Sequence, residues 1–385
     1  MGQNPTSGVL SLARRRDIYK LCSKYDIIIV EDDPYWYLQF PSSTAVNSTN
    51  NLVPGTDNFN PDVKILANGE PRPEEWKSSG FAFLDALVPS YVSVDTDGRV
   101  VRLDTFSKTI APGCRLGWIT AQPALVERIL RITETSTQQP SGFVQSMIAE
   151  LILGPDHSGL ETPPKTTSKN GKGKGGLEDG QGWKAAGWVR WLEGLRGNYE
   201  RRMQKMSTIL DEGRYHVKTG RRSSLGDEDD EWSVVEKTQM YSFDWPIGGM
   251  FIWLKVHFES HPLYSHYAKQ SSPTNKNDGL MRLARALWLF WTTSPYLVLV
   301  SPGTIFSPTE EIRNRHGWKF FRLCFAAIDE SELGPTSKRL ADGVNAFWQV
   351  RDAKVIEKLL ADDDTAVNVR AEESGGMMAQ MIGPC

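Results

Sequence analysis

Residues 102–118 read Arg102-Leu103-Asp104-Thr105-Phe106-Ser107-Lys108-Thr109-Ile110-Ala111-Pro112-Gly113-Cys114-Arg115-Leu116-Gly117-Trp118, and this segment holds the clearest chemical signal in the chain. Val100–Leu103 predicts a short strand, so Lys108 follows a strand end among hydroxyl residues. Such a lysine suits Schiff-base chemistry, and Thr105, Ser107 and Arg115 are donors of the kind that bind phosphate oxygens. A lysine in a loop is more commonly a solvated surface residue; the local grouping favours a site here.

A second polar segment follows an apolar run. The run is Ile27-Ile28-Ile29-Val30, which is typical of a strand buried on both faces of a parallel sheet. It leads directly into Glu31-Asp32-Asp33-Pro34-Tyr35, at the carboxyl end where open α/β sheets bind ligands. Acidic residues also cap turns and helices, so this segment alone leaves ligand binding and capping open.

Hydrophobic periodicity predicts the other elements. An amphipathic helix is expected with Leu10, Ile18, Leu21, Cys22 and Tyr25 on its apolar side and Arg14, Arg15, Arg16 and Lys20 opposite. Further helices are expected at 124–135, 144–153, 188–210, 280–291 and 340–360. Strands are expected at 116–119, 240–243, 251–256, 297–300 and 320–325. The first 150 residues are therefore βα-like, and the later part is α+β.

Three stretches break this pattern. Residues 154–187 contain a Gly- and Lys-rich run and almost no large apolar side chain, which predicts a disordered insertion. The run lacks the interleaved aromatic residues of a nucleic-acid-binding tail and the spacing of a P-loop, so a solvated loop explains it better. The acidic run 227–231 predicts a second surface insertion, and residues 361–385 predict a frayed tail.

The composition excludes several classes of protein. The chain has 385 residues, 44 basic and 47 acidic, and a net charge of −3, which excludes a generally basic nucleic-acid binder and a highly charged disordered chain. No apolar run reaches the length of about 18 residues that a membrane span needs, and the first residues lack secretory-signal features. The four cysteines have no paired spacing, which fits a cytoplasmic protein, and the six histidines form no metal-binding cluster.

Five ordered motifs together resemble one family. Ser107-Lys108, with the run through Pro112-Gly113 to Trp118, resembles the lysine motif of class I/II, fold-type I aminotransferases, which use pyridoxal phosphate. The other matches are Asn4-Pro5-Thr6-Ser7-Gly8 with Ser7 as an extra residue, Asp32 with Tyr35, Ser301-Pro302-Gly303 with Phe306, and Arg322. The wording of 31–35 and of Gly248-Gly249-Met250-Phe251-Ile252-Trp253 is most similar to fungal aromatic and 2-aminoadipate aminotransferases. The resemblance covers most of residues 1–360.

The resemblance implies catalytic roles for three residues. Lys108 would hold the cofactor as an internal aldimine and move a proton to and from the substrate Cα. Asp32 would pair with the pyridine nitrogen and keep it protonated, which makes the ring an electron sink. Tyr35 and Asn4 would hydrogen-bond the ring oxygen. The implied reaction is ping-pong transamination of aromatic or related amino acids with a 2-oxo acid acceptor.

Binding roles follow from the same resemblance. Thr105, Ser107 and Arg115 would bind the cofactor phosphate, and Arg322 would bind the substrate α-carboxylate in a bidentate fork, with Asn4 beside the substrate. Amino acid and 2-oxo acid substrates are the implied partners, without metal, nucleic acid or membrane. A homodimer is implied for the complete protein.

The resemblance also predicts the architecture: an α/β protein with an incomplete fold-type I large domain, made of a mostly parallel sheet with flanking helices, and a smaller α+β C-terminal domain. The expected parts are a partial cofactor-binding domain at 1–153, the insertion at 154–187, a linking helix with the small domain at 188–360, and the tail at 361–385. The family places much of its main domain before the Asn-Pro-Thr-Gly loop, which begins at residue 4 here. We therefore expect an N-terminally truncated large domain and little activity of the chain by itself.

Two other interpretations remain. The chain could be a catalytically inactive remnant, or the product of a mispredicted gene model, that only associates with a full-length relative. A transcription regulator with an aminotransferase-like domain is disfavoured, because no helix-turn-helix segment precedes the motifs.

Overall fold

The structure, a computed structural model, describes residues 2–41, 64–154, 184–222, 232–270, 272 and 275–363. It divides the chain into two compact units, Met1–Arg201 with Pro246–Met250, and Arg202–Trp245 with Phe251–Cys385. The predicted insertion at 154–187, the acidic run 227–231 and the tail 361–385 fall mainly or wholly outside the described residues.

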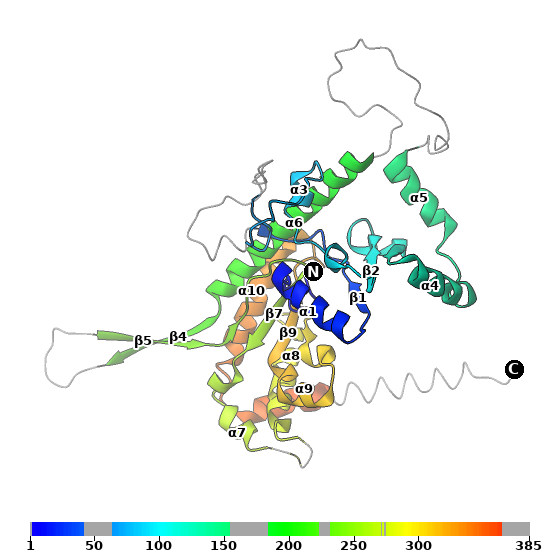
Figure 1. The fold of residues 1–385 in the computed structure, drawn as a ribbon. Helices are drawn as coiled ribbons and strands as arrows, with labels where there is room; N and C mark the ends of the chain where they lie inside the picture. The colour runs from blue at the N-terminus through cyan, green and yellow to red at the C-terminus, as the bar shows by residue number, and fades with distance from the viewer. Residues whose placement is uncertain are drawn as a thin grey trace, which may run out of the picture. The chain divides into compact units, whose positions relative to one another are not determined.

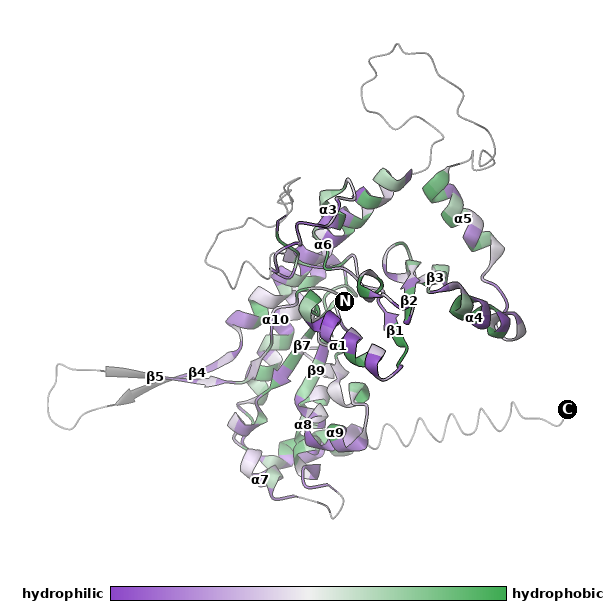
Figure 2. Ribbon diagram, viewed as in Figure 1, coloured by the Kyte–Doolittle hydropathy of each residue, from purple (hydrophilic) through white to green (hydrophobic). Residues whose placement is uncertain are grey.

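The first unit contains a three-stranded sheet with the order β1-β2-β3, formed by Ile29–Asp32, Val100–Thr105 and Gly117–Thr120. Figure 1 labels β1 and β2, and Figure 2 labels all three strands. β1 and β2 are parallel, with Asp32 opposite Leu103, whereas β2 and β3 are antiparallel, with Thr105 opposite Gly117. The α/β character is as predicted, although only one of the two pairings is parallel. A short connection such as 106–116 can reverse the chain into an antiparallel partner, while a parallel partner requires a longer crossover.

The first helix forms as predicted, but it buries a different side. Helix α1 spans Leu12–Lys24, and its buried residues are Leu12, Arg15 and Tyr19. Leu21 and Tyr25, assigned to the apolar side, are 57% and 64% exposed. The polar partners explain the difference, because Arg15 pairs with the buried Glu31 and the Tyr19 hydroxyl donates to Asp95 at 2.9 Å. The helix is oriented by these polar contacts rather than by its apolar stripe.

The prediction that 27–30 is buried on both faces of the sheet is wrong. Ile27, Ile28 and Val30 are 50%, 52% and 62% exposed. The face of β1 that bears Glu31 lies against α1 and the 3₁₀ helix η1, Tyr91–Val94, where Tyr19, Tyr91 and Val100 form a small core. The opposite face is open to solvent in the described part of the chain, so its β-branched side chains stay exposed.

Three of the remaining helices of the first unit lie close to the expected ranges: α4, Pro123–Thr135; α5, Gly142–Leu153; and α6, Lys184–Glu212, of which the part up to Arg201 belongs to this unit. The short helix α3, Ala82–Asp85, was not predicted. A core of Phe83, Leu87, Val189 and Leu192 joins α3 to α6. The apolar periodicity that predicted the long helix is therefore used for packing.

The second unit contains a four-stranded antiparallel sheet with the order β6-β7-β9-β8. The strands are Tyr241–Ser242, Phe251–Val256, Phe320–Cys324 and Ser301–Pro302, in that order across the sheet. β7 and β9 are coloured mainly as hydrophobic in Figure 2, as expected for central strands. The predicted strand at 297–300 does not form, and the β-structure begins at Ser301 instead. An unpredicted hairpin pairs β4, Tyr215–Arg222, with β5, Trp232–Gln239.

Helices accompany this sheet: α7, Tyr264–Ala268; α8, Asp278–Thr292; α9, Glu310–Arg315; α10, Glu330–Phe347; and a last helix at 353–363. The single helix predicted at 340–360 is thus divided, since α10 ends at Phe347. Trp291 of α8 is fully buried, and its Nε1 donates to the Leu340 carbonyl at 3.0 Å. None of the helices described has both the length and the apolar composition required to cross a bilayer.

Candidate functional site

The lysine segment folds into two short turns between β2 and β3. The 3₁₀ helix η2, Phe106–Lys108, begins at Thr105, whose hydroxyl accepts a hydrogen bond from the Ser107 N–H at 3.1 Å. A second 3₁₀ helix, η3, spans Pro112–Cys114, and Phe106 N–H donates to the Leu116 carbonyl at 3.0 Å to close the loop. These bonds place Lys108 at the carboxyl end of β2.

Three of the predicted phosphate-binding side chains lie together. The Thr105 hydroxyl donates to Ser107 Oγ at 3.0 Å, and Arg115 Nη1 donates to the same Ser107 oxygen at 3.2 Å. Arg115 has a left-handed backbone conformation, with φ of 45°, at the end of η3. Its guanidinium therefore turns back toward Ser107 and Thr105, which come earlier in the chain. Two hydroxyls and one guanidinium form a cluster suited to an anion.

This cluster lines an open depression of about 300 Å³, bounded also by Leu103, Leu116 and Ile119. Gly117 forms part of its wall, and a Cβ atom at this position would lie 2.4 Å from the Asp104 carbonyl oxygen. A side chain larger than hydrogen would force β2 and β3 apart. The glycine thus maintains the close strand approach beside the hydroxyl cluster.

Lys108, Tyr35 and Asp32 occupy the neighbouring strand ends. The Lys108 ammonium lies 5.8 Å from the centre of the buried Tyr35 ring. Asp32, the last residue of β1, is exposed, whereas Glu31 and Asp33 on either side of it are buried. The alternation of side chains along the strand therefore leaves Asp32 available to a ligand and turns its neighbours inward.

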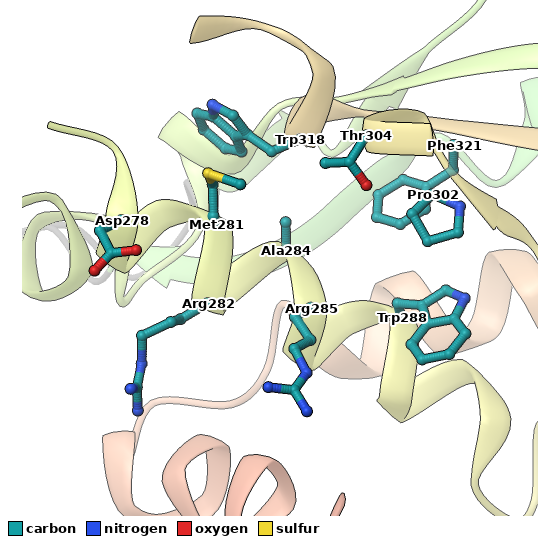
Figure 3. A pocket seen from close by; sticks show the side chains of 10 residues that line it. All are labelled: Asp278, Met281, Arg282, Ala284, Arg285, Trp288, Pro302, Thr304, Trp318 and Phe321. Carbon is teal, nitrogen blue, oxygen red and sulfur yellow. The ribbon is translucent and has the colours of Figure 1, made fainter. Parts of the chain in front are cut away.

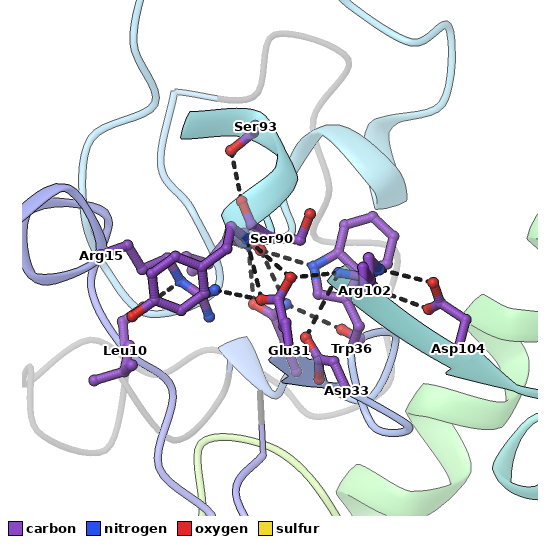
Figure 4. A network of polar contacts seen from close by, with 12 residues as sticks. Leu10, Arg15, Glu31, Asp33, Trp36, Ser90, Ser93, Arg102 and Asp104 are labelled. Carbon is purple, nitrogen blue, oxygen red and sulfur yellow. Dashed lines mark hydrogen bonds and ion pairs between the residues drawn. The ribbon is translucent and has the colours of Figure 1, made fainter. Parts of the chain in front are cut away.

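A buried charge network lies on the inward side of β1 (Figure 4). Arg15 Nη1 donates to Glu31 Oε1 at 2.7 Å, and the Tyr91 N–H lies 3.1 and 3.0 Å from the two Glu31 oxygens. Arg102 lies on the other side of Glu31 and forms a fork with Asp104. Burial raises the pKa of the Asp33 carboxyl above its ordinary value, an effect that the nearby Arg102 guanidinium opposes.

Asn4 lies in a tight turn near the start of the chain. Ser7 N–H donates to the Gln3 carbonyl at 2.6 Å and Gln3 N–H to the Gly8 carbonyl at 3.1 Å, which closes the turn and leaves Asn4 exposed. The turn follows Gly2, whose φ is 64° and whose Cβ, if present, would lie 2.4 Å from the Gly249 nitrogen. The Gly248-Gly249 motif therefore belongs to the same unit as Asn4, far though it is along the chain.

Arg322 belongs to the second unit. It occupies the middle of β9, opposite Trp253 on β7 and Ser301 on β8. Its guanidinium lies 4.3 Å from the Phe251 ring and 4.7 Å from the Phe306 ring, and Nη2 donates to Ser301 Oγ at 3.3 Å. Both distances are within the range of cation–π contacts. The Ser301-Pro302-Gly303 and Phe306 motif thus packs directly around Arg322.

A second cavity, of about 390 Å³, lies in the same unit beside α8 (Figure 3). Its apolar lining consists of Met281, Ala284, Trp288, Pro302, Trp318 and Phe321. Two arginines at its edge are already paired, Arg282 with Glu357 at 2.5 Å and Arg285 with Asp363 at 2.6 Å. None of the residues predicted for catalysis lines this cavity. Among the described residues, no group of three or more His, Cys, Asp or Glu side chains could hold a metal ion.

The charge network is not evident from the sequence pattern. The pattern gives Arg102 no role within the lysine segment and places Arg15 on the exposed side of its helix. A signal was available, because Arg102 interrupts the otherwise apolar strand Val100–Leu103. A charge buried in a strand requires an opposite charge nearby, and Glu31 and Asp33 supply it.

The fold and the lysine site define an α/β protein of the fold-type I aminotransferase class. Residues 3–163 match the family described as Aminotransferase class I and II, and this part of the chain belongs to it, as the motifs predicted.

The similar proteins are aminotransferases. L-tyrosine:2-oxoglutarate aminotransferase atrD of Tapinella panuoides is 34% identical over 280 residues, which are 72% of this chain and 39% of that protein. Aromatic amino acid aminotransferase 2 of Saccharomyces cerevisiae is 28% identical over 352 residues, 90% of this chain and 54% of that protein. The crystal structure of aminotransferase Aro8 from Candida albicans matches with a TM-score of 0.57 at 26% identity, covering 91% of this chain and 56% of that one. The chain therefore spans between 39% and 56% of the length of these proteins.

Proposed function

We propose that the first unit carries the lysine, aspartate and phosphate-binding residues of an aminotransferase that uses pyridoxal 5′-phosphate to transaminate aromatic amino acids, with a 2-oxo acid as acceptor. The observation that supports this most directly is the cluster of Thr105, Ser107 and Arg115 next to Lys108. The substrate class is suggested by the relatives, one of which is a tyrosine:2-oxoglutarate and another an aromatic amino acid aminotransferase.

The donor set fits the chemistry of the cofactor. Two hydroxyls and a guanidinium match the oxygens of a phosphate, and they line a depression rather than a closed core. The exposed carboxylate of Asp32 can pair with a cation, as a protonated pyridine nitrogen requires. Pyridoxal phosphate, when bound, supplies an electron sink for the electrons released at the substrate Cα.

Each of the proposed site residues in the first unit would have its own role. Thr105, Ser107 and Arg115 would hold the phosphate, and Asp32 would keep the ring nitrogen protonated. The Lys108 amine would bind the cofactor and afterwards take and return the proton at the substrate Cα. The Tyr35 hydroxyl would donate a hydrogen bond to the ring oxygen, because its ring packs near Lys108.

Substrate binding is proposed for Arg322 and Asn4. The guanidinium of Arg322 contacts two aromatic rings, and its planar fork suits bidentate binding of an α-carboxylate. Asn4 has an exposed amide in a closed turn, so it can meet a ligand without a change of backbone.

The test of the function is covalent labelling of the whole chain. After incubation with pyridoxal phosphate and reduction with borohydride, peptide mass spectrometry should find the cofactor on Lys108. Lys108→Ala should lose the label, together with whatever transamination of tyrosine or phenylalanine with 2-oxoglutarate the wild-type chain shows. Lys24→Ala, which changes an exposed lysine in the last turn of α1, is the matched control and should keep both. A label on another lysine, with full turnover in Lys108→Ala, would falsify the assignment.

A second candidate function is association with another polypeptide. It is favoured by exposed apolar side chains on three elements of the first unit, with Val30 62%, Ile132 66% and Phe143 76% exposed. Light scattering distinguishes the two candidates, since a chain that only associates forms an assembly but takes up no cofactor. Ile132→Ser with Phe143→Ser should then reduce the assembly.

We further propose a cofactor-binding domain at 1–153, a C-terminal domain at 188–360, a homodimer and a cytoplasmic location. Cys22, Cys114 and Cys324 are free thiols, which supports a reducing compartment. The division of the chain into two compact units supports a two-part organisation, although the units meet at Arg201 and Arg202 rather than at residue 188.

A further inference from the structure

One guanidinium contacts carboxylates on both strands that lead to the candidate site (Figure 4). The side chain of Arg102, in β2, is 8% exposed. Its Nε and Nη2 each donate to one Asp104 oxygen at 2.8 Å, which forms a bidentate fork. Its Nη1 lies 3.5 Å from Glu31 Oε2 and 3.7 Å from Asp33 Oδ2.

The partners of Arg102 are sequence neighbours of the site residues. Glu31 and Asp33 flank Asp32 at the end of β1, and Asp104 directly precedes Thr105 on β2. The guanidinium also lies 4.9 Å from the ring of Trp36, the residue after Tyr35. A shift of the Arg102 side chain would therefore move Asp32 and Tyr35 relative to Thr105 and the lysine turn.

Stability alone does not account for so many buried charges. Backbone pairing from Ile29 to Asp32 against Val100 to Leu103 already joins the two strands. Buried ion pairs seldom stabilise a fold more than well-packed apolar side chains of the same volume. A planar guanidinium, however, fixes the directions of several carboxylates at once, which a point charge such as lysine cannot do.

We propose that Arg102 is a positioning residue that sets the distance and orientation between Asp32 on β1 and the Thr105–Lys108 turn after β2. It acts through Glu31, Asp33 and Asp104 rather than by touching a ligand. This inference rests on the proposed function, because it concerns the geometry of that same site.

The test compares Arg102, inside β2, with Arg99, which lies just before the same strand. Arg102→Lys keeps the charge and removes the fork. Arg99→Lys is the matched control, since Arg99 also forms a fork, with Asp97 at 3.0 and 2.6 Å, but lies just before β2 and away from the site residues. For both variants the whole chain is assayed for kcat, KM, pyridoxal phosphate affinity and unfolding in urea. Hydrogen exchange of segments 31–36 and 104–108 is measured without cofactor.

Arg102→Lys should lower kcat on the order of 100-fold, as expected for a displacement of about 1 Å in a catalytic group, with little change in KM. It should also weaken pyridoxal phosphate binding and speed hydrogen exchange in both segments. Arg99→Lys should match the wild type in kcat, cofactor affinity and exchange of these segments.

Two results would overturn the proposal. One is wild-type kcat and cofactor affinity in Arg102→Lys; the other is a loss of stability with unchanged kcat per folded molecule, which would show a merely structural role. If the wild-type chain takes up no cofactor, the proposed function fails, and the exchange data then decide the role of Arg102. Faster exchange confined to the two segments in Arg102→Lys would support positioning, and wild-type exchange would refute it.

Discussion

The Arg15–Glu31 pair offers the sharpest test of how this fold holds β1. Both side chains are almost fully buried, 2% and 7% exposed, and the charged atoms lie 2.7 Å apart. Arg15→Met keeps an unbranched apolar stem but removes the guanidinium, which leaves the Glu31 carboxylate without its closest cation. Removing one partner of a buried ion pair typically costs about 3–5 kcal/mol.

The remaining contacts of Glu31 set the expected value within this range. Its oxygens still accept from the Tyr91 N–H, and Arg102 Nη1 lies 3.5 Å away. These groups partly compensate the negative charge of Glu31 in the variant. We therefore expect the free energy of unfolding to fall by about 3 kcal/mol, the lower end of the range. Arg15→Met combined with Glu31→Gln should lose less than the sum of the two single changes, because neither charge is then left alone.

The assay is urea unfolding followed by circular dichroism, with hydrogen exchange of residues 29–32 to assign the loss to the first unit. Arg16→Met, on the exposed side of the same helix, is the control and should change stability by less than about 0.5 kcal/mol. Equal stability of Arg15→Met and Arg16→Met would refute the argument. It would mean that the apolar contacts of Leu12 and Tyr19, rather than the ion pair, orient α1.

Three further predictions concern pH, the ring nitrogen and the substrate carboxylate. Burial lowers the pKa of His261 from 6.5 to about 4, so the unfolded chain binds more protons than the folded chain between these pH values. The free energy of unfolding of the second unit should therefore fall by about 3 kcal/mol as the pH falls from 7 to 4. His261→Gln should flatten this pH dependence, which urea unfolding measures. Asp32→Asn should reduce kcat by several orders of magnitude while cofactor occupancy, read from visible absorbance, stays high; a rate near wild type would move this role to Asp33. Arg322→Lys should raise KM for every amino acid and oxo acid tested, because lysine cannot reproduce the bidentate fork. An effect confined to one substrate class would instead mean that Arg322 recognises the substrate side chain.

Local pattern was sufficient for most elements. The helices at 12–24, 123–135 and 142–153 and the strand at 251–256 all lie near their predicted ranges, because the spacing of apolar residues distinguishes a helix from a strand. The local sequence pattern was insufficient where strand formation depends on pairing with another segment. The apolar run 297–300 forms no strand, and the hairpin of β4 and β5 was missed, since strand pairing depends on a partner elsewhere in the chain.

The sequence by itself determined the family, because motif order and residue type are properties of the chain. Ser107, Lys108 and Arg115 could be named as a group from their spacing and their resemblance to one family. Only the tertiary structure decided which charges are buried. Arg15 and Arg102 look like surface residues in the sequence, yet they converge on Glu31 from a helix and from the neighbouring strand. The reverse holds for Val30, which looks buried and is exposed. Burial depends on what covers a face, and covering is made by segments that are distant in sequence.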